Sequence, residues 1–157
     1  MTDDILAAIN ALPEYQIELG VISLNNKRKK TKTKTVRIGI TNAELMFIHE
    51  NGSPLRSIPA RPVLQMTIDY VNANLIKATI DKCINAFIKS NFDVSSVEKE
   101  LNKLCIKIEN YARELIYSND GRLAPNSPAV AAKKKGNHPL FDTGQLARSI
   151  TCKLVKL

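Results

Sequence analysis

The feature that most constrains the fold is a long stretch of helical periodicity in the middle of the chain. From about residue 63 to residue 89, apolar side chains recur every three or four positions, and the pattern returns from residue 97 to residue 115. This spacing places the apolar side chains on one face of an α-helix. The short segment NFDVSS separates the two stretches. Such a short connection predicts two long antiparallel helices that pack through these faces.

Each helix has its own apolar stripe. The first, expected over residues 63–89, carries Leu64, Ile68, Val71, Leu75, Ile80, Ile84 and Phe87. The second carries Val97, Leu101, Leu104, Ile108, Ala112 and Leu115. Ser95 and Glu98 match a capping box, which predicts the start of the second helix. We interpret both stripes as core, because apolar residues at this spacing normally pack against a neighbouring element.

Alternating apolar and polar residues predict a small antiparallel sheet. Residues 15–21 and 36–40 both alternate with period two, and they flank a basic segment. We expect a β-hairpin whose basic tip is residues 25–35; the alternative is a disordered linker. Residues 149–156 also read as a strand, with Ile150, Cys152 and Leu154 on one face. The turn residues in HPLFDTGQLARSI would fix where this strand enters the same sheet, since a slip of one residue reverses its faces.

Shorter elements complete an expected single domain of residues 1–157. A helix is expected over residues 2–11, where Ile5, Leu6 and Ile9 share a face. Thr41 and Glu44 form a second capping box, and Gly52 can end the helix that it starts. The proline-rich residues 53–62 predict a rigid extended connector. Residues 118–141 predict a long loop that becomes ordered on assembly. The fold class is therefore α+β: a small antiparallel sheet packed against a pair of long antiparallel helices and short helices.

Composition narrows the class of protein. No apolar run approaches the roughly 18 residues of a membrane helix, and the acidic start MTDD lacks the charged region of a secretory signal. We expect a soluble protein made in a cytoplasm, without a membrane partner. The three cysteines have no CxxC spacing. Cys83 and Cys105 fall in the apolar stripes, which favours small buried hydrophobic side chains over disulfides.

The positive charge is concentrated in two runs. The chain has 23 basic and 15 acidic residues, a net charge of +8. Nine of the basic residues lie in the two runs, which leaves 14 against the 15 acidic residues. The runs are Lys27, Arg28, Lys29, Lys30, Lys32 and Lys34, then Lys133, Lys134 and Lys135. This pattern indicates contact with DNA or with an acidic partner surface, and the alternative is a pair of solvated loops.

No pattern in the sequence indicates catalysis. His49-Glu50 lacks the second histidine of HExxH, and no phosphate-binding loop, dinucleotide fingerprint or nucleophile elbow occurs. His138 and Asp142 are too few for a metal site. We expect no enzyme activity, no cofactor, no metal and no catalytic residue. A small hydrolase is a further alternative, for which no site can be named.

Four short motifs, taken in order, resemble the virion-morphogenesis or tail-completion proteins of tailed phages. The first is His49, Glu50 and Gly52; the second is Ile58, Pro59, Ala60, Arg61, Pro62 and Leu64. The third is Pro125, Asn126, Ser127, Pro128, Lys134, Lys135 and Gly136. The last is Pro139, Leu140, Asp142, Thr143, Gly144, Gln145, Leu146, Ser149 and Ile150. Val63 stands where this family usually has Phe, and Phe141 where it has Ile or Val. Residues 66–118 carry no motif of the family.

The resemblance implies a structural role in the head–tail connector of a virion. It implies a ring of this chain, of six-fold symmetry, at the neck or upper tail, after assembly in the host cytoplasm. Its neighbours would be neck and tail proteins such as a stopper, a tail terminator or the tail tube, with packaged DNA in the channel. The expected assembly interface is Arg61, Pro139, Leu140, Asp142, Thr143, Gly144, Gln145 and Leu146.

Two of these assignments have structural alternatives. The last motif either builds both the final strand and an assembly surface, or only fixes the fold. Arg61 either forms an intersubunit salt bridge or bonds locally to a helix end or an acidic neighbour. The competing function is nonspecific binding of double-stranded DNA through the basic hairpin, by phosphate contacts that weaken as salt rises.

Overall fold

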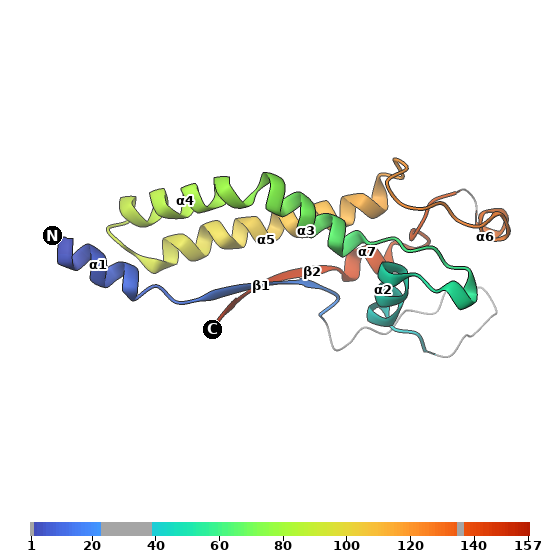
Figure 1. Cartoon of the computed structure of the whole chain (residues 1–157), viewed down its shortest axis with the longest axis horizontal. Helices are drawn as coiled ribbons and strands as arrows, with labels where there is room; N and C mark the ends of the chain where they lie inside the picture. The colour runs from blue at the N-terminus through green and yellow to red at the C-terminus, as the bar shows by residue number, and fades with distance from the viewer. Residues whose placement is uncertain (1, 23–38, 135–136) are drawn as a thin grey trace.

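The computed structural model describes residues 2–22, 39–134 and 137–157 of the chain. Its architecture is α+β, as expected, with helices packed on a two-stranded antiparallel sheet (Figure 1). In chain order the elements are α1 (Thr2–Asn10), β1 (Tyr15–Gly20), α2 (Asn42–Asn51), the 3₁₀ turn η1 (Pro54–Arg56), α3 (Val63–Asn74), α4 (Ile76–Lys89), α5 (Val94–Tyr117), α6 (Pro128–Lys133), α7 (Gln145–Ser149) and β2 (Thr151–Lys156).

Helix α5 is the centre of the fold. It lies between α4 and the sheet in Figure 1, and it also packs against α3 and α7. Its apolar stripe is buried as predicted, from Leu104 through Ile108 and Ala112 to Leu115. The predicted capping box at Ser95 is wrong, because the helix begins earlier. The side chain of Asp93 accepts the N–H of Ser95, so Asp93 is the N-cap residue.

The first predicted helix is divided in two at Leu75. Helices α3 and α4 flank this residue, whose φ of −114° departs from regular helical geometry. The predicted stripe is partly wrong: Ile68, before the break, and Ile80 and Ile84, after it, are exposed. Helix α5 covers only part of each apolar face, so the periodicity overstates how much of it is buried. Phe87 is buried as expected, and α4 still runs antiparallel to α5.

The sheet joins the beginning of the chain to its end. Strand β1 pairs with β2 in antiparallel register, from Tyr15 opposite Lys156 to Gly20 opposite Thr151. The predicted final strand is thus confirmed, although Ser149 belongs to α7. The expected second hairpin strand and its basic tip fall mainly on residues 23–38, which lie outside the described residues; Ile40, which is described, is in no strand.

Two side chains of α5 fix the entry of β2. The Glu109 carboxylate accepts the N–H of Cys152 at 3.1 Å, and the Arg113 guanidinium donates to the carbonyl of Ile150 at 2.9 Å. Glu109 and Arg113 also form an ion pair at 2.8 Å. Because these groups bond the main chain at Ile150, just before β2, and at Cys152 within it, they fix where the strand begins.

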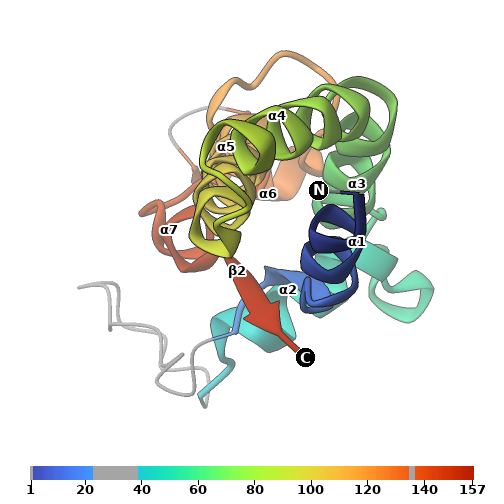
Figure 2. The ribbon, with the colours of Figure 1, turned by 90° about the vertical axis from the view of Figure 1, so that its left-hand side faces the viewer.

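Buried apolar residues form two clusters along α5. One consists of Val71, Leu104 and Ile108, and Ile17 and Leu19 of the sheet pack against it. The larger one lies where α5 meets α2, α3 and α7, and consists of Met46, Val63, Ala112, Leu115, Ile116, Leu123, Leu146, Ala147 and Ile150. Between them, the rings of Tyr70 and Tyr111 stack with centroids 3.8 Å apart. Figure 2, a view along the molecule, shows α5 on the left and α3 on the right, with α4 across the top between them.

The remaining elements agree with the sequence in part. The capping box of Thr41 and Glu44 is present at the start of α2. The connector of residues 53–62 is not wholly extended, because it contains η1 and a bridge between Ser53 and Ile58. The expected loop of residues 118–141 contains the short helix α6. In the part of the chain that the structure describes, no helix combines the length and apolar character needed to cross a bilayer.

Candidate interaction site

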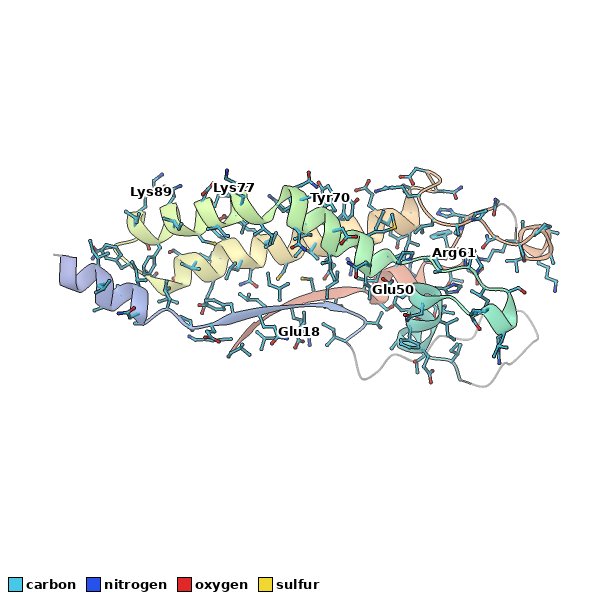
Figure 3. All side chains as sticks on the ribbon, in the orientation of Figure 1. Glu18, Glu50, Arg61, Tyr70, Lys77 and Lys89 are labelled. Atoms are coloured by element: carbon cyan, nitrogen blue, oxygen red, sulfur yellow. The ribbon has the colours of Figure 1, made fainter. Side chains whose placement is uncertain are left out.

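A groove of about 390 Å³ brings together the four sequence motifs. Its walls come from the end of α2, the connector before α3, the segment around α6, and the turn before α7. The lining residues are Leu45, His49, Arg56, Ser57, Ile58, Pro59, Arg61, Asn126, Ser127, Val130, Lys134, Leu140, Asp142 and Leu146. Segments far apart in sequence therefore meet at one place. Figure 3 labels Arg61, which lines the groove, and Glu50 near it.

Arg61 is the side chain that ties these walls together. It is only 4% exposed. Its Nε donates to the carbonyl of Ala124 and its Nη2 to the carbonyl of Pro125, each at 2.7 Å. Its Nη1 lies 3.2 Å from Nδ1 of His49. Burial lowers the pKa of the Arg61 guanidinium. The structure thus joins the second motif to the first and the third through one buried cation.

The first motif holds the connector and α3 in place. Glu50 accepts the N–H of Leu64 at 3.0 Å and that of Gln65 at 2.8 Å. These N–H groups lie in the first turn of α3, whose own N-cap residue, Pro62, makes no side-chain capping bond. A carboxylate there also complements the helix dipole. The sequence gives no local signal for this contact, because the capping side chain comes from another helix.

Gly52 is required by a close approach of two backbone segments. Its φ is +73°, and a Cβ at this position would lie 2.8 Å from the backbone nitrogen of Ala60. The carbonyl of His49 also accepts the N–H of Arg61 at 2.6 Å. All three residues of the first motif therefore contact the region of the second motif or the helix it begins. Packing therefore accounts for their spacing.

The last motif is a turn fixed against the end of α5. The Nε2 atom of His138 lies 2.6 Å from the carbonyl oxygen of Ile116. The ring of His138 stacks on Phe141, which also meets Tyr117 edge to face with centroids 5.7 Å apart. Gly144, with φ of +70°, begins α7. The aromatic ring of Phe141 thus packs between two other rings.

The structure divides the expected interface residues into buried and exposed ones. Arg61, Pro139, Gly144 and Leu146 are buried in their own chain. Arg61 bonds within its own chain, to the carbonyls of Ala124 and Pro125 and beside His49. The assembly role of these four residues stays a prediction. Asp142 is exposed. Leu140, Thr143 and Gln145 are half-buried.

The basic residues are only partly within the described structure. Lys133 is exposed at the end of α6, and Nζ of Lys134 donates to the carbonyl of Phe141 at 3.0 Å. Lys134 therefore contributes to the groove as a packed side chain. Lys27, Arg28, Lys29, Lys30, Lys32, Lys34 and Lys135 lie outside the described residues.

The groove has the chemistry of a binding surface. Its lining combines apolar side chains, such as Leu140 and Val130, with the cationic Arg56 and the exposed Asp142. Within the described residues, the amide nitrogen of Asn126, a residue of the groove lining, is buried without a hydrogen-bond partner. No cluster of three His, Cys, Asp or Glu side chains suited to a metal occurs in residues 2–22, 39–134 or 137–157.

Comparison with known proteins returns nothing that resembles the chain. No protein-family model, no curated protein and no solved structure matches it.

Proposed function

We propose that this protein is a structural component of the head–tail connector of a tailed phage, a tail-completion or neck protein that assembles as a ring. The observation that carries the proposal is the convergence of the four motifs on the groove around Arg61. Arg61 of the second motif contacts His49 of the first and the carbonyl of Pro125 in the third, so segments more than 60 residues apart form one structural unit.

The groove supplies a contact surface for a neighbouring protein of the virion. It is open, mixed in polarity and built on the packed end of the molecule, where α2, α3, α5 and α7 share a core. A packed scaffold with a groove of mixed polarity suits recognition of a protein segment. The proposed partners are further copies of this chain and neck or tail proteins such as a stopper, a tail terminator or the tail tube. The proposed location is the neck or upper tail of the virion.

The first test is native mass spectrometry of the purified protein, alone and mixed with the neck and tail proteins encoded beside it. We expect a discrete ring or a stoichiometric joint complex. The variant Asp142→Lys reverses the exposed negative charge of Asp142 in the groove and is expected to weaken the joint complex. Asp69→Lys is the matched control, because Asp69 is an exposed acid on α3 outside the groove. A wild-type protein that forms no complex with any neighbour would contradict the proposal.

Nonspecific DNA binding is a second candidate because nine basic residues lie in two short runs. Replacing the six basic residues between positions 27 and 34 by Ser should then abolish duplex binding. Wild-type affinity should also fall steeply with salt, because phosphate contacts release counterions. If the substituted protein keeps its affinity for DNA, this candidate is wrong. In a connector ring, the same residues would face DNA in the channel or an acidic neighbour.

A further inference from the structure

Helix α4 carries an apolar stripe that nothing in the described chain covers. Ile80, Ile84 and Ile88 follow one another at intervals of four residues, and each is between 52 and 59% exposed. The neighbouring part of the helix surface, which includes the buried Phe87, packs on α5. An exposed row of large aliphatic side chains is unusual on a protein that stays alone in solution. It is therefore a candidate docking surface.

A second uncovered apolar surface lies on α1. Its residues Leu6 and Ile9 are 61 and 50% exposed and share one helical face. Figure 1 shows α1 projecting from the same end of the molecule as the C-terminal half of α4, without another helix against it. An amphipathic helix of nine residues is too short to be stable without packing. Helix α1 therefore needs a surface on which to pack.

The two surfaces match in length. The stripe from Ile80 to Ile88 spans eight residue steps, about 12 Å along α4. Helix α1 has nine residues, about 13 Å. One helix can therefore cover the whole stripe of the other. Both present side chains at intervals of three or four, the spacing that allows two helices to interdigitate.

The two surfaces also match in charge. Residues 76–89 contain three lysines, Lys77, Lys82 and Lys89, and one acid, Asp81, for a net charge of +2. Figure 3 labels Lys77 and Lys89 on the outer side of α4. Residues 1–12 contain two aspartates and no lysine or arginine, a formal side-chain charge of −2. Opposite charge favours contact of α1 with α4 and disfavours contact of α4 with another α4.

We infer that the stripe of α4 binds α1 of a second copy of this chain. Each copy then offers one of each surface, so the contact is head to tail. Repetition of a head-to-tail contact closes a ring or extends a filament. The inference deepens the proposed function, on which its biological setting rests, by naming the surfaces that join one subunit to the next. It uses neither the groove nor the basic runs.

The test uses two variants that each remove one surface. Ile84→Glu places a charge in the stripe, and Leu6→Glu places a charge on α1. Both positions are exposed, so the fold should be retained, and circular dichroism checks this. We expect wild-type protein to form oligomers in sedimentation velocity. Each variant alone should raise the dissociation constant at least about 30-fold, the effect of losing one central contact residue.

Mixing the two variants makes the test specific. The Ile84→Glu protein keeps α1, and the Leu6→Glu protein keeps the stripe, so one sound interface remains between them. We expect the mixture to form a 1:1 dimer and nothing larger. Ile106→Glu is the matched control. Ile106 is an isoleucine on α5 with a similar exposure, 61%, but it lies beside Lys103 and Lys107 and outside both proposed contact surfaces. It should assemble like the wild type. The milder Ile80→Gln repeats the stripe test if Ile84→Glu does not fold.

The outcomes separate the inference from the proposed function. A wild-type protein that stays monomeric at all concentrations overturns the inference, including the case in which α1 packs on its own α4. Oligomers that both variants leave intact also overturn it. If the protein still binds neck or tail proteins in either of these two cases, the proposed function survives. If the variants break assembly and their mixture restores a dimer, the inference holds even when no tail protein binds.

Discussion

Replacing Arg61 by Met should destabilise the whole protein. Arg61 donates two 2.7 Å hydrogen bonds from a charged group to the carbonyls of Ala124 and Pro125. Hydrogen bonds to charged groups contribute about 1.5–3 kcal/mol each, and buried carbonyls left unpaired cost a similar amount. Removing the buried charge recovers part of its desolvation cost. We therefore expect a net loss of about 3 kcal/mol in the free energy of unfolding.

The measurement is urea unfolding followed by circular dichroism, supported by a thermal melt. A loss of this size should lower Tm by about 6–12 °C in a domain of this length. Arg61→Lys should fall between the wild type and Arg61→Met, because an ammonium group lacks the planar fork that bonds both carbonyls. Trypsin should also cleave faster after Lys133 and Lys134, since the segment that Arg61 holds is released.

Arg56→Met is the matched control for this prediction. Arg56 lines the same groove but is exposed. A surface substitution of this kind changes stability by about 0.5 kcal/mol or less. The reasoning is refuted if Arg61→Met stays within about 1 kcal/mol of the wild type, the worth of one ordinary hydrogen bond. It is also refuted if Arg61→Lys is as stable as the wild type.

Three further predictions concern single side chains. Gly52→Ala should lower the free energy of unfolding by about 1–3 kcal/mol. The loss should exceed that of Gly144→Ala, because a Cβ at position 52 would meet backbone, whereas one at position 144 would meet mainly the movable end of a side chain. Urea unfolding of the two variants compares these losses. Burial, with the nearby Glu98, raises the pKa of Tyr15 from 10.0 to about 12. The fold thus favours the neutral phenol, so stability should fall between about pH 10 and 12, and Tyr15→Phe should remove that part of the fall; an unchanged profile contradicts this. Burial also raises the pKa of the Cys152 thiol, which should react with a thiol reagent more slowly in the folded protein than after unfolding, as peptide mapping would show.

The elements that the sequence predicted well are those with local or periodic signals. The capping box at Thr41 depends on a residue three positions away, and it is present. The stripe of α5 follows one regular helix without a break, so Leu104 and Ile108 are buried as expected. The final strand was predicted from alternation, and its pairing with β1 places Cys152 opposite Leu19.

The errors arise where distant parts of the chain decide the outcome. Periodicity identified an apolar face on α4 but did not show how much of it α5 would cover, so Ile84 was expected in the core and is exposed. No glycine or proline near Leu75 indicates that the helix breaks there. For Arg61, the sequence showed a cation between prolines; that its partners are carbonyls more than 60 residues away could not be read from it.

The pairing of β1 with β2 has a mechanical consequence. The chain enters the sheet at Tyr15 and leaves it at Lys156, and these residues face each other at the same end of the ladder. Tension applied through residues 14 and 157 would therefore load the interstrand bonds one pair at a time, because bonds in an antiparallel ladder run perpendicular to the strands. The strands would peel apart in small steps at low force. Helices α3, α4 and α5 lie outside this line of tension, so their packing would remain intact while the sheet opens and recloses.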